Sequence, residues 1–350
     1  IIGCGASTSL GRSAPASATA LRAGISRFCE HPYLLNQVGE PMVVARASFV
    51  QPDRSDERIC IMAQAAAAEA LASADTRWRT GRLPVVVGLP PSRPGRCQDL
   101  PERVARAVAL GTGEARPIQT IECGHAAGLL ALEHAMESIR SGRENLYLVG
   151  GADSYLDVDT LEWLEDRGKL HGAGRRNNAW GFVPGEAASF LLLAAVDRRT
   201  GPSSARADCA VLAVASGTET CLIDTDAVCT GAALTAAMRR VLDHLPADTR
   251  VDEVLCDLNG EPYRSDEFGF ALARTSDRFA DADRYTAPAD CYGDTGAASG
   301  PLFIATELVT AGLRGAGKAS HCLVWTSSDS GERGCALLRT STGGRAWVHR

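Results

Sequence analysis

The sequence predicts an α/β fold made of two similar halves. Strand-like and helix-like stretches alternate along its 350 residues, which is the pattern of this class. One order of segments also occurs twice: a turn of small residues, a long helix, a strand, a short turn and a final strand. The first turn reads C-G-H-A-A-G at residues 123–128, and the second reads G-D-T-G-A-A-S-G at residues 293–300. A polar stretch at residues 198–207 marks the expected boundary, so we assign residues 1–200 to the first half and 201–350 to the second.

Short apolar runs predict the strands, and longer runs of small and apolar residues predict the helices. In chain order, the expected strands are residues 1–5, 83–89, 145–150, 188–195, 210–216, 253–257 and 322–326. The expected helices are residues 57–72, 126–141, 231–244 and 297–311. The Ala-rich residues 62–72 indicate a helix buried between sheets.

The composition excludes several classes of protein. A hydrophobic content of 45% and a charged content of 22% are typical of a soluble globular protein. The net charge of −6 and the absence of a Lys/Arg-rich run argue against a nucleic-acid surface. No apolar run reaches the length we expect of a membrane span, and the apolar start lacks the basic region of a signal peptide. Twelve Cys without a C-x-x-C pair or a Cys/His cluster indicate reduced cytoplasmic thiols rather than disulfides or a metal site.

Cys123 is the most informative residue of the chain. A strand-like stretch runs into it, and a helix-like run of small residues follows at once. The unpaired N–H groups and the dipole of such a helix would lower the pKa of the thiol. This pattern suggests a nucleophile that accepts an acyl group. The alternative is a buried structural Cys, and Glu122 would oppose a thiolate if its carboxylate points inward.

Three segments resemble the β-ketoacyl synthases, the thiolase-fold condensing enzymes of fatty-acid and polyketide synthesis. The run G-F-V-P-G-E-A-A at residues 181–188 matches the family signature G-F-V-x-G-E-G/A-A. The start I-I-G-C-G-A-S-T-S-L-G resembles the family's first strand and loop, and S-G at residues 141–142 followed by L-Y-L-V-G-G at residues 146–151 resembles the segment after the nucleophile helix. The resemblance covers nearly the whole chain and puts Cys123 at the place of the acyl-accepting Cys.

The resemblance implies a thiolase fold, with two βαβαβαββ halves layered α-β-α-β-α and Cys123 at the central seam. It also implies a dimer in which the strand at residues 117–121 pairs across the twofold axis and hides a sheet edge. The dimer is either a homodimer or a heterodimer with a ketosynthase. Glu186 of the signature is expected to be a buried, hydrogen-bonded carboxylate.

The second half departs from the family's chemistry. Asp257 and Asp294 stand where the family has its two active-site His, the family's Lys before the second His is absent, and the Gly-rich loop reads D-S-G-E-R-G at residues 329–334. In the family the two His donate hydrogen bonds to the oxygen of a malonyl thioester. An ionised Asp only accepts hydrogen bonds, and it repels a developing negative charge. We therefore do not expect decarboxylative condensation of the usual kind.

Acyl loading on Cys123 is less affected by these changes. The backbone N–H of Cys123, with one from Ser330 or Gly331, would still form an oxyanion site. We expect an acyltransferase that forms a thioester on Cys123, with the phosphopantetheine of an acyl carrier protein or a CoA thioester as substrate and no bound cofactor. Asp257 or Asp294 would act as general base.

Two further residues are expected near the acyl pocket. Phe182 would line it, and His171, in the loop L-H-G-A-G, would reach it as a mobile base or remain a solvated loop residue. His125 is not expected to share a face with Cys123, because residues two apart on a helix point to roughly opposite sides.

A function of another class is also open. The chain would then be a non-catalytic partner of an active ketosynthase, similar to the chain-length factors, and would only shape a cavity. Retention of Cys123 favours the enzyme, whereas the loss of both His and the altered Gly-rich loop favour the partner. An ordinary condensing enzyme with unfamiliar hydrogen-bond donors is a third, minor hypothesis.

Overall fold

The computed structural model describes residues 1–75, 78, 83–113, 118–175, 177–195, 209–314 and 319–340. Within these residues the first half forms a five-stranded sheet in the order β1-β7-β6-β4-β5. Its strands are β1 (Gly3–Thr8), β4 (Val85–Gly88), β5 (Ile118–Ile121), β6 (Leu146–Ser154) and β7 (Glu186–Ala194). The strand β4 pairs in parallel with β5 and β6, and β7 pairs antiparallel with β6 and β1.

The second half forms a four-stranded sheet of the described residues, in the order β8-β11-β10-β9. Its strands are β8 (Cys209–Thr218), β9 (Glu253–Leu255), β10 (Ser320–Ser327) and β11 (Glu332–Thr340). The strand order matches that of the first sheet when β1, β7, β6 and β4 are set against β8, β11, β10 and β9. A parallel bridge from Leu255 of β9 to Thr286 stands where β5 pairs with β4. The two halves therefore repeat one plan, as the sequence predicts.

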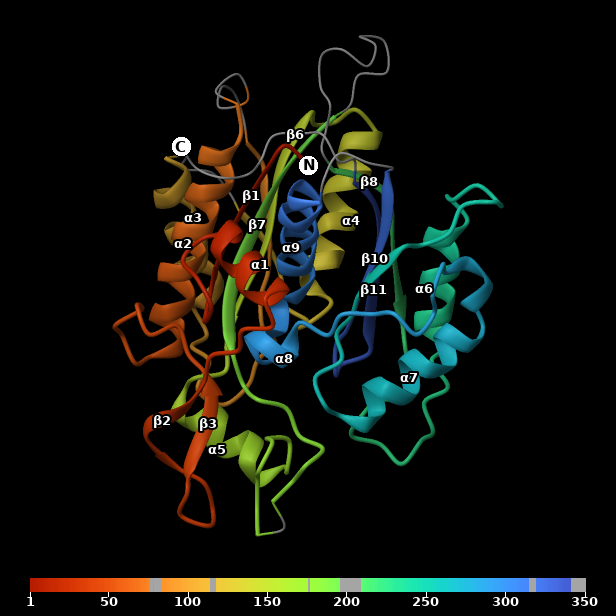
Figure 1. The fold of residues 1–350 in the computed structure, drawn as a ribbon. Helices are drawn as coiled ribbons and strands as arrows, with labels where there is room; N and C mark the ends of the chain where they lie inside the picture. Colours follow the sequence, from red (N-terminus) through yellow and green to blue (C-terminus); the bar gives the residue numbers. More distant parts are fainter. Residues whose placement is uncertain are drawn as a thin grey trace.

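Helices and sheets alternate in five layers, which Figure 1 shows from the side. The helices α2 (Ser55–Ser73) and α3 (Leu100–Thr112) cover the outer face of the first sheet, and α6 (Ala232–Leu242) and α7 (Pro262–Ala273) cover that of the second. The helices α1 (Ala14–Arg22), α4 (Ala127–Arg140) and α9 (Ser299–Leu313) lie between the sheets. This is the α-β-α-β-α arrangement that the resemblance implies. The Ala-rich helix α2 packs against one sheet, beside α3 on its outer face, rather than between two sheets.

The two central helices begin in close contact with each other. A Cβ atom on Gly128 of α4 would lie 2.3 Å from the Cδ of Pro301, and one on Gly300 of α9 would lie 2.7 Å from the Cγ of Leu129. The small residues of the two predicted turns thus allow the N-terminal ends of α4 and α9 to pack face to face. The largest apolar core surrounds this contact and extends to the inner faces of both sheets.

A smaller unit caps the end of the molecule that carries the site. The ribbon of β2 (Phe28–Leu35) and β3 (Pro41–Ala45) lies beside α5 (Val158–Asp166), and both views show them below the first sheet. Met42 and Val44 of the ribbon share a core with Leu161 of α5 and with Phe182. The short helix α8 (Ala289–Tyr292) lies nearby and precedes the second turn of small residues. The sequence analysis did not predict the ribbon or α5.

Three expectations need comment. The segment Gly296–Leu313 has the length and hydropathy of a membrane span, contrary to our expectation, but 83% of it is buried inside the protein, as in a core helix. The predicted boundary between the halves, at residues 200 and 201, lies outside the described residues.

The strand β5 pairs only with β4 within the described part of the chain, so it lies at an edge of the sheet. The dimer that would pair this edge stays a prediction.

Packing at Gly128 gives a test of the central contact. Gly128→Ala should lower the free energy of unfolding by about 1–3 kcal/mol, because the added methyl group meets Pro301 in a filled core. The matched control is Gly269→Ala in α7, where a Cβ atom has open space. This control should be neutral or stabilising by up to about 1 kcal/mol. Urea unfolding measures both, and an equal effect of the two substitutions would contradict the close contact of α4 with α9.

Candidate active site

Cys123 lies in a tight turn between β5 and α4. The turn is set by Gly124, whose φ of +81° is a left-handed conformation that favours Gly, and whose N–H donates to the carbonyl of Leu89 at 3.2 Å. The N–H of Ala126 donates to the hydroxyl of Ser328 at 2.9 Å, which ties the turn to the second half of the chain. Regular helix begins only at Ala127, four residues after Cys123.

The half-buried side chain of Cys123 lines a cavity of about 290 Å³. The first half contributes Cys123, His125 and Phe182 to its wall, and the second half contributes Arg264 and Ser330. The cavity therefore lies at the seam between the halves, where the resemblance places the acyl site.

The thiol of Cys123 is less acidic than the sequence predicts. Burial is the largest cause, the carboxylate of Glu332 adds to it, and together they raise the pKa of Cys123 to about 12 against a smaller opposing effect of the Ser328 hydroxyl. The carboxylate of Glu122 pairs with Arg96 instead of pointing toward the sulfur. The expected lowering of this pKa is thus wrong, because the helix dipole acts mainly within the first turn and that turn starts after Cys123.

His125 is buried and forms a short contact with Asp294. Its Nε2 donates to Oδ1 at 2.8 Å and lies 3.0 Å from Oδ2, while Nη2 of Arg264 lies 3.4 Å from Nδ1. Burial lowers the pKa of His125, but the charge of Asp294 outweighs it and the net pKa rises to about 9. This pKa favours an imidazolium at neutral pH, whereas the contact of Nδ1 with Arg264, whose guanidinium can only donate, suits a neutral His125 with its proton on Nε2. His125 lines the same cavity as Cys123, contrary to our expectation, because residues 123–125 precede the helix and do not follow helical spacing.

Asp294 is enclosed by hydrogen-bond donors. Besides His125, it accepts from the side-chain amide of Asn259 at 2.7 Å and from the N–H of Gly296 at 2.9 Å. Burial opposes ionisation, but the charges and hydrogen bonds of His125, Arg264 and Asn259 hold the pKa of Asp294 well below its usual range. It is ionised and lies behind the cavity wall.

Asp257 is held by Arg264 in a similar way. Its Oδ2 accepts from Nη1 of Arg264 at 3.0 Å and from the N–H of Ser327 at 2.9 Å. Burial raises the pKa of Asp257 to about 6, against the opposing charges of His125 and Arg264. Like Asp294, it is absent from the cavity wall. The structure therefore does not bring either predicted general base to Cys123.

Arg264 joins these groups into one network. Its guanidinium also donates to Glu261 at 3.1 Å, to Asp329 at 3.0 Å and to the carbonyl of Ser327. This side chain is buried and comes from the first turn of α7. The sequence analysis missed it because a single Arg in an ordinary helix start carries no signal of burial.

Phe182 lies where the sequence predicts it. Its ring is buried, lines the cavity and packs against that of Tyr155, with the ring centres 5.5 Å apart. His171 is exposed on a turn outside the wall of this cavity, and its backbone N–H donates to the carbonyl of Phe182 at 2.9 Å. Nothing in this geometry brings the imidazole of His171 to Cys123.

In the loop that replaces the family's Gly-rich segment, one backbone N–H is already hydrogen-bonded within the protein. The N–H of Gly331, whose φ is +113°, donates to the carbonyl of Ser328 at 3.1 Å, so it does not serve as an oxyanion donor. Ser330 lines the cavity and its hydroxyl donates to Glu332 at 2.6 Å. The N–H groups of Cys123 and Ser330 donate no hydrogen bond within the described residues, and both remain available to a ligand.

Glu186 confirms the structural role that the sequence predicts for it. It is fully buried and accepts hydrogen bonds from the N–H of Ala47 at 2.7 Å, from Nε of Arg58 at 2.8 Å and from the hydroxyl of Ser154 at 3.0 Å. The signature segment thus anchors the end of the first sheet rather than the chemistry.

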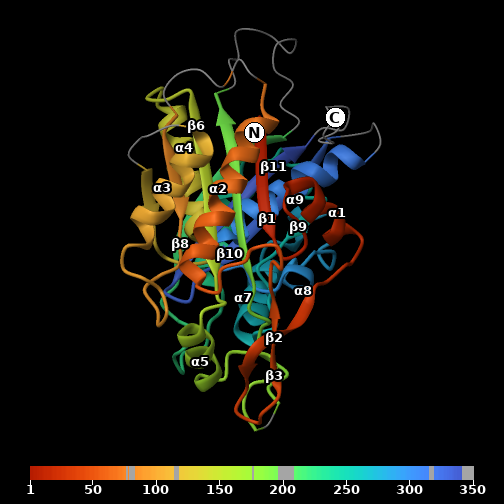
Figure 2. The same ribbon diagram turned by 90° about the vertical axis from the view of Figure 1, so that its left-hand side faces the viewer.

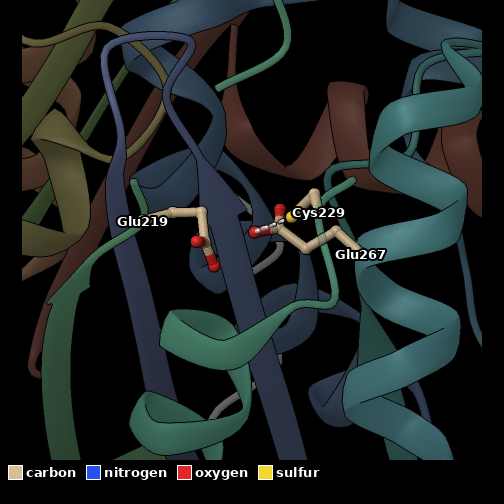
Figure 3. Close-up of side chains that lie close together, drawn as sticks. All are labelled: Glu219, Cys229 and Glu267. Carbon is tan, nitrogen blue, oxygen red and sulfur yellow. Dashed lines mark hydrogen bonds between the residues drawn. The ribbon is translucent and has the colours of Figure 1, made fainter. Parts of the chain in front are cut away.

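A buried group of possible metal ligands lies away from the cavity. Figure 3 shows Glu219, Cys229 and Glu267 with their polar atoms close together. Glu267 already accepts from Nε of Arg333 and from the hydroxyl of Ser327, each at 2.6 Å. Backbone N–H groups occupy the carboxylate of Glu219. A buried guanidinium beside Glu267 would repel a cation. These contacts instead hold β11 and the start of α6 in place.

Comparison with known proteins supports the resemblance in the segment that carries Cys123. Residues 93–198 match the family described as β-ketoacyl synthase, N-terminal domain, and this segment includes Cys123 and Phe182. No curated protein sequence matches the chain at a significant level.

Solved ketosynthase structures share the fold over nearly the whole chain. The ketosynthase from module 6 of the bacillaene synthase of Bacillus subtilis 168 aligns with a TM-score of 0.77 and 13% identity over 98% of this chain and 72% of that chain. The ishigamide ketosynthase/chain length factor aligns with a TM-score of 0.72 and 22% identity over 97% and 99% of the two chains. A type II PKS acyl-carrier protein in complex with its ketosynthase bound to the hexaketide (AntDE:AntF) aligns with a TM-score of 0.76 and 16% identity over 97% and 98%.

The family match and these alignments confirm the resemblance found in the sequence. Residues 93–198 match the β-ketoacyl synthase model, and the chain as a whole has the thiolase fold of the ketosynthases.

Alkylation of Cys123 should report the raised pKa directly. With a pKa of about 12, the thiolate fraction and the rate with iodoacetamide should rise about tenfold per pH unit from pH 7 to pH 10. The exposed Cys29 should react faster at pH 7, and Glu332→Gln should speed the reaction of Cys123 by removing a nearby negative charge. Peptide mapping measures both thiols. A rate at Cys123 that levels off below pH 9 would show a lowered pKa and refute this assignment.

Proposed function

We propose that this protein, which has the fold of the β-ketoacyl synthases, is an acyltransferase that carries an acyl group as a thioester on Cys123. The donor is an acyl carrier protein or a CoA thioester, as in fatty-acid or polyketide-type biosynthesis. The observation that carries the proposal is the position of the Cys123 side chain, on the wall of a cavity of about 290 Å³ at the seam of a ketosynthase fold.

The loading step is a thioester exchange. The sulfur of Cys123 attacks the carbonyl carbon of the donor thioester, the bond from that carbon to the donor sulfur breaks, and the thiol proton ends on the departing donor thiol. The N–H groups of Cys123 and Ser330 support the negative oxygen of the intermediate, and one such donor is worth roughly two to three powers of ten in rate. The hydroxyl of Ser328 hydrogen bonds to the thiol and favours its deprotonation.

The same site does not favour decarboxylative condensation. That reaction needs donors that point into the cavity at the two positions where the family has His. Here Asp257 and Asp294 lie behind the wall, and the Nε2–H of His125 is spent on Asp294. The bound acyl group therefore passes to a hydroxyl, an amine, water or an unconventional carbon nucleophile.

A second candidate function is a chain-length-factor-like partner of an active ketosynthase. The raised pKa of Cys123 and the closed network around Arg264 favour it, since neither is suited to a reactive nucleophile. The structural alignment to the ishigamide ketosynthase/chain length factor is consistent with such a partner. In that case the cavity only shapes a product, and the edge of β5 that has no partner strand among the described residues would pair with the ketosynthase.

Intact mass after incubation with acyl-CoA and acyl carrier protein donors tests the proposal. One acyl group per chain should appear on the wild type and on the control Cys29→Ala, whose thiol is exposed and outside the cavity. None should appear on Cys123→Ala. A malonyl group should load with its carboxylate intact. Loss of CO₂ at a rate typical of the family would contradict the argument against condensation, and a wild type that takes no acyl group from any donor would favour the partner function.

A further inference from the structure

The guanidinium of Arg93 faces the cavity with part of its hydrogen-bonding capacity unused. Its Nη2 donates to Asp153 at 2.6 Å and to the carbonyl of Ser154 at 2.7 Å. The remaining nitrogens, Nε and Nη1, have no acceptor among the residues that the structure describes, and Nε is fully buried. The side chain is 6% exposed, and Nη1, which is not enclosed as Nε is, is the nitrogen that a ligand in the cavity can reach. A buried donor without an acceptor is costly and uncommon in folded proteins.

Tyr155 supplies a second donor beside Arg93. The guanidinium carbon of Arg93 lies 4.4 Å from the centre of the Tyr155 ring, and both residues line the cavity. Burial raises the pKa of Tyr155, so its hydroxyl keeps its proton. That hydroxyl makes no hydrogen bond within the described residues either. Phe182 also packs against this ring, with the ring centres 5.5 Å apart.

The cavity wall carries charges of both signs. Its carboxylates are all ion-paired: Asp224 with Arg167 and Lys169, Glu261 with Lys169 and Arg264, and Asp329 with Arg264. Arg93 also lines the wall, whereas its partner Asp153 is buried and does not. The carboxylates of the wall are thus already engaged, while Nη1 of Arg93 and the hydroxyl of Tyr155 have no partner among the described residues.

We propose that Arg93 and Tyr155 together bind an oxygen substituent of the acyl group, and so select oxygen-bearing acyl groups over alkyl chains of the same length. This inference rests on the proposed acyl transfer at Cys123 and names its substrate class: short acyl groups with a keto or hydroxyl oxygen. The cavity of about 290 Å³ is at the small end of ligand pockets, which favours a short group. An alkyl chain would leave both donors unpaired, whereas a keto oxygen would accept from both.

Loading rates with two donors of equal carbon number test the selection. Acetoacetyl-CoA should load Cys123 about 10–100-fold faster than butyryl-CoA on the wild type. Tyr155→Phe should reduce this ratio about tenfold, because it removes only a hydroxyl that has no partner in the folded protein. Arg93→Met should reduce it further, although it leaves Asp153 unpaired and costs stability.

The matched control is Tyr285→Phe, the same chemical change on a half-exposed ring outside the cavity wall. It should keep the wild-type ratio, which separates selection from the different intrinsic reactivity of the two thioesters. If the wild type loads both donors and Tyr155→Phe leaves their ratio unchanged, the selection is refuted while acyl transfer stands.

A binding measurement tests the donor pair even if no thioester transfers its acyl group to Cys123. Calorimetry on the Cys123→Ala protein compares the affinities for acetoacetyl-CoA and butyryl-CoA without chemistry. A preference for acetoacetyl-CoA that Tyr155→Phe abolishes would support the donor pair even if acyl transfer fails. Equal affinities would overturn it.

Discussion

The buried network around Arg264 is the interaction on which the site depends. Burying an ionised carboxylate is costly unless a partner of opposite charge and further hydrogen bonds come with it. Asp257 and Asp294 are both buried, and Arg264 and His125 supply the compensating charges. His125 belongs to the first half of the chain, whereas the two Asp and Arg264 belong to the second. The network therefore fixes the turn of Cys123 against the second half, and with it the shape of the cavity between them.

This network changes what the ketosynthase fold can do at its seam. Asp257 and Asp294 stand at the two positions where the family has His. Asp257 is hydrogen-bonded to Arg264 and Asp294 to His125, and neither Asp lines the cavity. The thiol of Cys123 stays neutral because it is half-buried and close to Glu332. Hydrogen-bond donors reach a ligand from another part of the wall, where Arg93 and Tyr155 stand. Thioester exchange fits such a site better than the formation of an enolate, since exchange needs no donors at the two positions where the family has His.

Local sequence patterns predicted the fold, whereas the chemistry of the site depends on contacts between residues far apart in the sequence. The repeated order of segments predicted the two similar halves, and Gly128 and Gly300 in the two turns of small residues allow α4 and α9 to pack closely. The buried role of Glu186 followed from the family signature. By contrast, the pairing of His125 with Asp294 joins residues 169 positions apart, which periodicity does not reveal. The pKa of Cys123 was predicted with the wrong sign because it depends on burial and on Glu332, neither of which is visible in the turn itself.

The protonation state of His125 tests the central claim most directly. Nitrogen-15 NMR of the imidazole side chains, assigned by His125→Gln, distinguishes an imidazolium from either neutral tautomer. The account predicts that both ring nitrogens of His125 carry protons at pH 7.5 and that the ring titrates near pH 9, because Asp294 raises its pKa. In Asp294→Asn the pKa should fall, since the compensating charge is gone. An unprotonated ring nitrogen on His125 at pH 7.5 in the wild type would contradict the charge pair and the network built on it.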